Sequence, residues 1–331
     1  MLKTLIISPN WIGDAVMTLP LITKLYKHGH EIHVLAPNIV APIYENSIYV
    51  AKVIQHEFQH KKLSIFARIK LAIELKKNTY KYIYILPNSL KSAIIPFIIK
   101  ADNIIGYKGE WPRKYLMTQY LTNQGKKLPM VEHYNNLSML ADDDKPNLIL
   151  QPKIDLKNNE TLACLQKFNI ADKKYIAMAI GAEYGPSKQW PLENFKTLID
   201  LIHKNYKDIY ILLLGSAKDK EAAQSLVQND KTINLCAKTS LTEAMHIIKK
   251  ASKVLTHDSG LMHISAAIGT ELLAIYGSTS PHHTPPLSNN SKYIWLNLEC
   301  SPCFKRTCPL KHYACLNGIK PQEVFENLFQ S

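Results

Sequence analysis

The stretch KTLIISPNWIGDAVMTLPLITKLYK, residues 3–27, decides the fold of this chain. Its first six residues, KTLIIS, contain three consecutive aliphatic side chains and predict a strand, and the amphipathic run 15–27 predicts a helix. A turn-rich loop joins the two and ends at Gly13 and Asp14. A strand, a loop and a helix in this order predict the first unit of a parallel α/β sheet.

The same alternation continues along the rest of the chain. In the first half, strands are expected at 31–36 and 82–86, a basic helical segment at 55–81, and a helix at 88–100 that Pro96 bends or shortens. In the second half, strands are expected at 175–180, 209–215, 232–236, 253–257 and 272–277, with helices at 192–205, 218–229, 241–251 and 259–268. The pattern predicts parallel sheets covered by helices on both faces, with ligand-binding residues in the loops that follow strands.

The length of the chain predicts more than one domain. Its 331 residues exceed the roughly 250 to 300 at which a single hydrophobic core stops growing. The segment 142–159 is charged, contains two prolines and has weak periodicity, as expected of a connection between domains. We therefore predict two doubly wound α/β domains, residues 1–160 and 161–331.

The charge of the chain favours an anionic partner without identifying it. The 40 Lys and Arg residues outnumber the 27 Asp and Glu residues and give a formal net charge of +13. The basic clusters are short and lack the regular aromatic residues that stack on single-stranded bases; they are Lys61-Lys62, Lys76-Lys77, Arg113-Lys114 and Lys126-Lys127. A polyphosphate, an anionic lipid surface or a phosphorylated glycolipid explains the charge as well as a nucleic acid does.

Two further features concern the cellular compartment. No apolar run approaches the roughly 20 residues that span a bilayer, and the first residues lack the segments of a secretory signal. We therefore expect a cytoplasmic protein.

The loop after the first strand contains a carboxylate with two possible roles. Asp14 stands at the start of the predicted helix, where an Asp is a favoured N-cap. The same carboxylate could instead point to a substrate and act as a general base.

Two loops of the second half have the composition of anion sites. In IGAEYGPSKQWP, residues 180–191, two glycines expose backbone N–H groups and Ser187-Lys188 adds a hydroxyl and a cation. In THDSGLMHISAA, residues 256–267, a strand ends at Asp258 and a helix starts through Ser259 and Gly260. The helix start predicts a diphosphate site, Asp258 an acceptor for sugar hydroxyls, and His263 a secondary candidate. GSTSPHHTPP, residues 277–286, is expected to rim the same pocket, with the roles of His282 and His283 open.

Four of the six cysteines form a C-x2-C-x4-C-x6-C cluster: Cys300, Cys303, Cys308 and Cys315. In a cytosolic chain such a cluster suggests a structural metal before it suggests disulfides. The spacing is no standard finger, so buried reduced thiols remain the alternative, and no metal is assigned.

Six motifs in chain order resemble one known family. They are PNWIGDAVMTLP, LPNSLKSAIIPF, IGAEYGPSKQWP, THDSGLMHISAA, YGSTSPHHTPPLS and CSPCFKRTCPL. Together, from about residue 3 to residue 327, they resemble the ADP-heptose:lipopolysaccharide heptosyltransferases, and the cysteine segment is similar to the II type. His257 and Ser187 depart from the family pattern, where Asn and Ala are common.

The resemblance implies a fold, a reaction and a place in the cell. The fold would be GT-B, with two Rossmann-like domains facing a cleft, the first binding the acceptor and the second the nucleotide sugar. The reaction would be inverting transfer of L-glycero-D-manno-heptose from ADP-heptose to heptosyl-Kdo-lipid A in Gram-negative lipopolysaccharide core synthesis. It would need no cofactor or metal. The enzyme would touch the cytoplasmic face of the inner membrane peripherally and bind no nucleic acid.

The resemblance also implies roles for single residues. Asp14 matches the proposed general base, and Lys188 matches a catalytic lysine that contacts the donor phosphate and sugar. Donor contacts are also implied for Ser187, Asp258, Ser259, Gly260, Leu261, Met262 and His263. Basic residues of 61–77, together with Arg113 and Lys114, are expected to meet acceptor phosphates or the membrane.

Three alternatives stay open. A heptosyltransferase of the I type or another ADP-sugar transferase shares the motifs. A nucleotide-dependent dehydrogenase or epimerase would show G-x-G-x-x-G in the first turn, where this chain has PNWIGD. A noncatalytic binder of anionic lipid or nucleic acid explains the net charge but leaves Asp14, Lys188 and Asp258 without a role.

Overall fold

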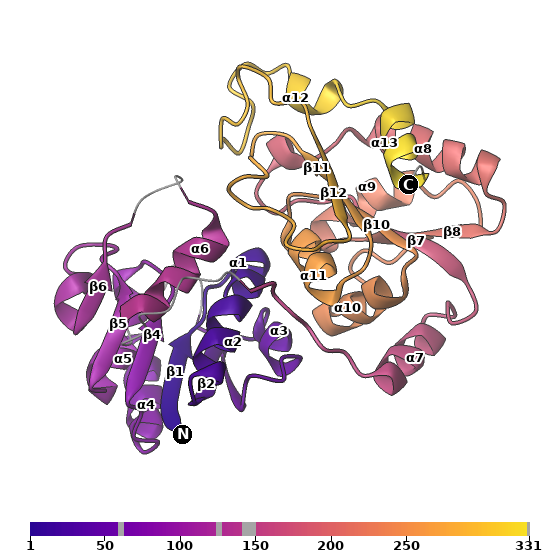
Figure 1. The fold of residues 1–331 in the computed structure, drawn as a ribbon. Coiled ribbons are helices and arrows are strands. Elements are labelled where there is room, and N and C mark those ends of the chain that lie inside the picture. The colour runs from indigo at the N-terminus through magenta and orange to yellow at the C-terminus, as the bar shows by residue number, and fades with distance from the viewer. Residues whose placement is uncertain (59–62, 124–127, 141–149, 330–331) are drawn as a thin grey trace. The chain divides into compact units, whose positions relative to one another are not determined.

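The computed structural model describes residues 1–58, 63–123, 128–140 and 150–329. The chain divides into two compact units, Met1–Lys153 and Ile154–Ser331 (Figure 1). Each unit is built around its own six-stranded sheet, in which all the neighbouring strands run parallel. The prediction of two parallel α/β sheets is confirmed.

The first unit has the strand order β3-β2-β1-β4-β5-β6. Its strands are β1 Leu2–Ile7, β2 His30–Pro37, β3 Lys52–His56, β4 Tyr82–Ile85, β5 Asn103–Tyr107 and β6 Gln119–Leu121. Its α-helices are α1 Ile12–Met17, α2 Leu19–Lys27, α3 Ala41–Glu45, α4 Ile65–Lys76, α5 Ile94–Ile99 and α6 Met130–Asn135.

The second unit has the strand order β12-β11-β10-β7-β8-β9. Its strands are β7 Lys174–Ala179, β8 Ile209–Leu214, β9 Thr232–Asn234, β10 Lys253–His257, β11 Leu272–Tyr276 and β12 Ser291–Trp295. Its α-helices are α7 Asn158–Lys167, α8 Leu192–Asn205, α9 Lys220–Ser225, α10 Leu241–Lys250, α11 Gly260–Ile268, α12 Ala314–Asn317 and α13 Pro321–Phe329.

Both sheets follow one plan. In each, the first strand of the unit lies next to the fourth, and the chain winds outward from this pair in both directions. In the first unit the pair is β1 and β4, with Ile7 opposite Ile85; in the second it is β7 and β10, with Met178 opposite Leu255. The loops after the two strands of such a pair diverge, which opens a crevice where doubly wound proteins bind ligands.

Apolar side chains on the sheets and their covering helices form one core in each unit. In the first unit, Leu5, Ile83 and Ile85 pack with Ile95 of α5. In the second unit, Ile211 of β8 belongs to a larger cluster of buried apolar side chains. These side chains are at most 2% exposed. Burying each aliphatic side chain contributes about 1.5 to 3 kcal/mol, so the strands that carry the loops are firmly held.

Several local predictions are wrong. The segment 55–81 is not helical throughout, because β3 reaches His56 and α4 covers only Ile65–Lys76. The predicted helix 88–100 is divided into a 3₁₀ turn, Leu90–Ala93, and α5. Pro96 is the third residue of α5, where a helix has no intrahelical N–H bond to lose.

The second unit begins before the expected residue 160. The N–H of Ile154 donates to the carbonyl of Ala267 over 3.0 Å, and Ile154 and Leu156 are buried. These contacts tie the chain to the second unit six residues before 160. The first part of the expected connection, 142–149, lies outside the described residues, as do Lys61-Lys62 and Lys126-Lys127.

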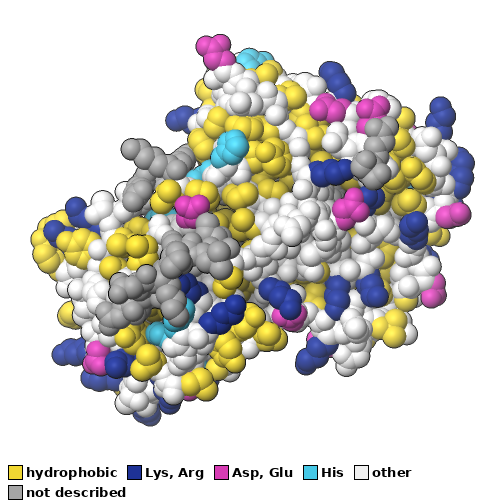
Figure 2. Space-filling model, in the orientation of Figure 1, with side chains coloured by type: hydrophobic (Ala, Val, Ile, Leu, Met, Phe, Trp, Pro, Cys, Tyr) yellow, Lys and Arg dark blue, Asp and Glu magenta, His cyan; other side chains and the backbone are white. Residues whose placement is uncertain are grey.

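Basic side chains do not gather in one place on the face drawn in Figure 2, where they are scattered among acidic and neutral ones. Within the described ranges, no helix has both the length and the apolar character needed to cross a membrane.

Candidate active site

Asp14 is the third residue of α1 and does not cap it. Trp11 occupies the N-cap position, with an extended backbone at φ −96° and ψ 139°. The Asp14 carboxylate instead accepts a hydrogen bond of 3.0 Å at Oδ1 from the hydroxyl of Tyr134 on α6. The interpretation of Asp14 as an N-cap is therefore wrong, and its carboxylate is oriented by a side chain from a distant part of the sequence.

A second tyrosine belongs to the polar network around Asp14. The hydroxyl of Tyr44 lies 2.9 Å from Ser8 Oγ and 3.1 Å from Thr18 Oγ1. Burial raises the pKa of Tyr44 to about 12. The pKa of Tyr134 is also raised, first by burial and then by the negative charge of Asp14. Both phenols therefore stay protonated at neutral pH and act as hydrogen-bond donors.

Lys188 and Asp258 form the charged pair of the second unit. Lys188 ends the 3₁₀ turn Pro186–Lys188 after β7, and Asp258 directly follows β10. The Lys188 Nζ lies 2.7 Å from Asp258 Oδ2 and 3.1 Å from the Asp258 carbonyl oxygen. The side chains are only 13% and 3% exposed, so the pair is poorly screened by water. The pair stands where the strand order of this sheet reverses, as expected of a ligand site.

Thr284 contacts the Asp258 carboxylate, a role that the sequence analysis did not predict. Its Oγ1 donates to Asp258 Oδ2 over 3.1 Å, and its carbonyl accepts from the Tyr276 hydroxyl over 2.6 Å. The segment 277–286 was expected to lie beside Asp258, and Thr284 is the residue of this segment that contacts it. Asp258 Oδ2 is thus held by a cation and a hydroxyl at once.

The start of α11 has backbone N–H groups that no side chain caps. Ser259 is the N-cap, with φ −145° and ψ 172°, but its hydroxyl pairs with Thr256 Oγ1 at 3.1 Å instead. The first amides of the helix, from Gly260 to Met262, can therefore bind an anion. The Met262 side chain is buried and accepts a bond from the Tyr276 hydroxyl, so its contact with a ligand would come from the backbone.

His263 lies one turn into α11 and is 4% exposed. Burial lowers its pKa to about 4, while Asp258 and Lys188 act on it in opposite directions. His263 is therefore neutral at physiological pH and adds no charge to the pair beside it.

Ser187 faces the cysteine segment. Its Oγ lies 2.9 Å from Ser278 Oγ and also donates to the carbonyl of Lys305, and its side chain is 1% exposed. Gly185 carries the same loop past this segment, and a Cβ there would lie 2.6 Å from the Arg306 carbonyl oxygen. These contacts hold the turn that carries Lys188. The donor contact expected of Ser187 stays a prediction, and its hydroxyl already has protein partners.

The four clustered thiols lie around one small cavity of about 20 Å³, together with Ser187 and Ser278. All four are free. Neighbouring backbone N–H groups, that of Tyr313 first, lower the pKa of Cys308, whereas burial raises the pKa of Cys315 to about 11. Over the parts of the chain that the structure describes, no three His, Cys, Asp or Glu side chains are arranged to hold a metal ion.

The two histidines of 277–286 make aromatic contacts. His282 packs edge-on against Trp295 at 5.6 Å between ring centroids, and His283 against Phe304 at 5.8 Å. They therefore help to fix this segment against β12 and the cysteine segment.

Comparisons with known proteins find similar chains that cover most of this one. Residues 68–314 match the model of glycosyltransferase family 9 (heptosyltransferase). A lipooligosaccharide heptosyltransferase 2 of Haemophilus influenzae is 35% identical over 89% of each chain. A lipopolysaccharide heptosyltransferase 2 of Escherichia coli K12 is 32% identical over 99% of this chain and 97% of that one. The solved ADP-heptose LPS heptosyltransferase II of E. coli superimposes with a TM-score of 0.86 at 30% identity, covering 99% of this chain and 97% of that one.

Proposed function

The chain belongs to glycosyltransferase family 9, the heptosyltransferases, and on this premise we propose that it transfers L-glycero-D-manno-heptose from ADP-heptose to heptosyl-Kdo-lipid A, with inversion at the anomeric carbon. It has the GT-B-like α/β fold of this family and acts in the biosynthesis of the lipopolysaccharide core. The observation that carries the proposal is the Lys188–Asp258 pair beside the uncapped start of α11.

The second unit would bind the donor. The amides at the start of α11 suit the diphosphate of ADP-heptose, because the positive end of the helix dipole favours an anion. Lys188 adds a cation next to these amides, and Asp258 can accept hydrogen bonds from hydroxyls of the heptose. As ADP departs, the same amides and Lys188 stabilise the charge that develops on its diphosphate.

The first unit would bind the acceptor and supply the base. Asp14 removes the proton of the attacking hydroxyl while that oxygen bonds to the anomeric carbon and the bond to ADP breaks. The oxygen attacks from the side opposite ADP, so one displacement inverts the centre. Tyr134 keeps the carboxylate of Asp14 in one orientation during this step. We expect no metal or cofactor to be needed, because Lys188 and the helix amides supply the positive charge.

We also propose that the first unit touches the cytoplasmic face of the inner membrane through α4. This helix exposes Phe66 and Ile73 by 86% and 57%, and its exposed Lys70 and Lys76 add positive charge. Exposed apolar side chains beside lysines are the combination by which helices bind anionic lipid surfaces. Arg113 cannot take part, since it is fully buried and the expectation that it meets phosphates or the membrane is wrong.

The test is ADP release by the purified enzyme with ADP-heptose and one of three additions: no acceptor, Kdo-lipid A, or heptosyl-Kdo-lipid A. We expect release only with heptosyl-Kdo-lipid A and unchanged rates in EDTA. Release with Kdo-lipid A alone would assign the enzyme to the I type instead. No release with either acceptor would overturn the proposed acceptor, and a rate that vanishes in EDTA would overturn the metal-independent mechanism.

A further inference from the structure

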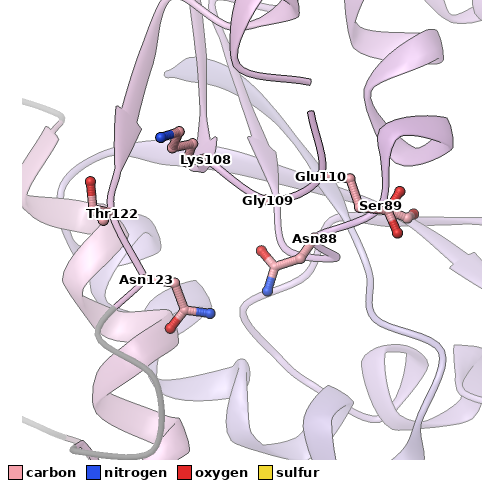
Figure 3. A pocket seen from close by; sticks show the side chains of 7 residues that line it. All are labelled: Asn88, Ser89, Lys108, Gly109, Glu110, Thr122 and Asn123. Atoms are coloured by element: carbon pink, nitrogen blue, oxygen red, sulfur yellow. The ribbon is translucent and has the colours of Figure 1, made fainter. Parts of the chain in front are cut away.

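A cavity of about 470 Å³ lies at the carboxyl edge of the first sheet (Figure 3). Three loops form it, each following a different strand. They contribute Asn88 and Ser89 after β4, Lys108 to Glu110 after β5, and Thr122 and Asn123 after β6. The volume lies in the range of sites that bind small molecules or single sugars.

The cavity is built on hydrogen bonds that join two of its loops. The N–H of Glu110 donates to the carbonyl of Asn88 over 3.0 Å, and the Glu110 Oε2 accepts from the N–H of Leu90 over 2.8 Å. The wall formed by the loops after β4 and β5 is therefore fixed before any ligand arrives, which reduces the entropy lost on binding.

A buried guanidinium lies behind the wall. Arg113 is fully buried, and its Nη2 donates to the carbonyls of Ile85 and Pro87 over 3.1 and 2.9 Å. Its Nε and Nη1 have no hydrogen-bond partner among the described residues. A Cβ on Gly109, which lines the cavity, would lie 2.9 Å from this Nη1. Burial lowers the pKa of Arg113 to about 10, so at neutral pH the positive charge persists directly behind Gly109.

The lining has the chemistry of a sugar site. It offers the amides of Asn88 and Asn123, the hydroxyls of Ser89 and Thr122, the ammonium of Lys108 and the carboxylate of Glu110. In Figure 3 the side chains of Asn88 and Asn123 extend toward each other across the hollow. Amides and hydroxyls both donate and accept, as sugar hydroxyls require. Lys108 and Glu110 balance each other and Arg113 adds one positive charge, which suits a single carboxylate better than a doubly charged phosphate.

We propose that this cavity binds the carboxylated sugar of the acceptor, with Lys108 on its carboxylate and the two asparagine amides on its hydroxyls. The inference rests on the proposed function, in which that sugar is the Kdo unit that carries the attacking heptose. Strands in a sheet lie about 4.8 Å apart, so β5 and β6 stand roughly 10 to 15 Å from β1, whose loop leads to Asp14. That spacing lets the heptose reach Asp14 while the next sugar occupies the cavity.

The kinetic test compares Lys108→Ala with Lys81→Ala, which removes an exposed lysine at the opposite end of β4. A charge-assisted hydrogen bond predicts that Lys108→Ala raises the acceptor KM roughly ten- to a hundredfold, with kcat and the KM for ADP-heptose unchanged. The acceptor KM of Lys81→Ala should stay within about twofold of the wild-type value.

The same experiment is repeated with an acceptor whose Kdo carboxylate is a neutral methyl ester. With the ester, the acceptor KM of the wild type should rise by about the same factor that Lys108→Ala causes with the native acceptor. The acceptor KM of Lys108→Ala should rise little further when the ester replaces the native acceptor. The assignment would be overturned if Lys108→Ala left the acceptor KM unchanged. It would also be overturned if the ester raised the acceptor KM by the same factor in the wild type and in Lys108→Ala.

A binding experiment separates this proposal from the proposed function. Saturation-transfer NMR with Kdo methyl glycoside should detect binding to the wild type and to Lys81→Ala, and a strongly reduced signal with Lys108→Ala. Transfer to heptosyl-Kdo-lipid A without such binding would leave the function standing and overturn the cavity assignment. Binding of the glycoside without transfer to either lipid acceptor would do the reverse.

Discussion

The Tyr134 hydroxyl donates a 3.0 Å hydrogen bond to the Asp14 carboxylate and joins α6 to α1. The two residues are 120 positions apart in the sequence. The α6 end of this contact is itself fixed, since the His133 ring stacks on Tyr107 at 3.8 Å between ring centroids and the His133 carbonyl accepts a hydrogen bond from the Tyr107 hydroxyl. The orientation of the proposed base therefore depends on packing between β5 and α6.

Replacing Asp14 by Asn should abolish most turnover while leaving donor binding intact. A general base contributes about 10² to 10⁴-fold, and the amide cannot take up the proton. Steady-state kinetics should show this loss in kcat with an unchanged KM for ADP-heptose. Asp102→Asn removes an exposed carboxylate at the amino end of β5 and serves as the control. Near-normal kcat in folded Asp14→Asn would assign the base elsewhere.

Tyr134→Phe should shift the acidic limb of the pH–rate profile upward by about one unit. The lost hydrogen bond stabilised the ionised carboxylate, so the base would hold its proton to a higher pH. At high pH the rate of Tyr134→Phe should be only a few-fold below that of the wild type. Tyr120→Phe, at an exposed position of β6, should leave the profile unchanged. A uniform loss at every pH would mean that Tyr134 only supports the fold.

Lys188→Met and Asp258→Asn should each lower the free energy of unfolding. The double variant should lower it by much less than the two single effects added together. Lys188→Met leaves a carboxylate that is 3% exposed without its cation, which costs about 3 to 5 kcal/mol in buried pairs. The double variant removes both charges and should recover most of the free energy of unfolding, measured in urea, while remaining inactive. Additive losses of stability would show that the pair contributes nothing as a pair.

Thr284→Val should weaken donor binding without removing activity. It deletes one hydrogen bond to Asp258 Oδ2 and leaves Lys188 in place. A loss of about 1 kcal/mol corresponds to roughly a fivefold higher KM for ADP-heptose. Thr284→Ser keeps the hydroxyl and should behave as the wild type. If Val and Ser variants behave alike, the hydroxyl is irrelevant to the site.

Stability should fall as the pH is lowered from about 6.5 toward 4. Burial lowers the pKa of both His257 and His263 to about 4, below the 6.5 of the unfolded chain. Both are neutral when folded, so their full contribution is present above pH 6.5 and is lost as the unfolded state takes up protons. Each should contribute about 1 to 2 kcal/mol of this loss at pH 5. Urea titrations of His263→Gln at pH 7 and 5 should show a smaller difference than the wild type, and an equal difference would contradict the assignment.

The sequence predicted the parts of the site that depend on local order. Asp14 follows β1 of the first sheet, and Lys188 and Asp258 follow β7 and β10 of the second; in each parallel sheet such positions lie at the carboxyl edge. Their positions after strands could be predicted from the sequence, because the apolar residues that form β1, β7 and β10 are strong signals.

The parts that were missed depend on tertiary contacts. Tyr134 and Thr284 carry no local mark, and each acts through a residue remote from it in the chain. The hydrogen bonds that Ser187 makes to Ser278 and Lys305 also join segments remote in the chain, and no local pattern predicts them; its donor contact stays a prediction. The missed strands β3, β5, β6 and β12 are short or carry exposed polar residues, so their alternation was too weak to read.

The identical strand order of the two sheets makes the molecule modular for protein engineering. The loop after β4, with Asn88, occupies the same place in its sheet as the loop after β10, with Asp258. Each loop is anchored within its own unit, by Arg113 in one case and by Thr284 in the other. Under the proposed roles of the two loops, we expect libraries that vary the loop after β4 to change which acceptor sugar is used. We expect libraries at Thr284 and its neighbours to change which donor sugar is used.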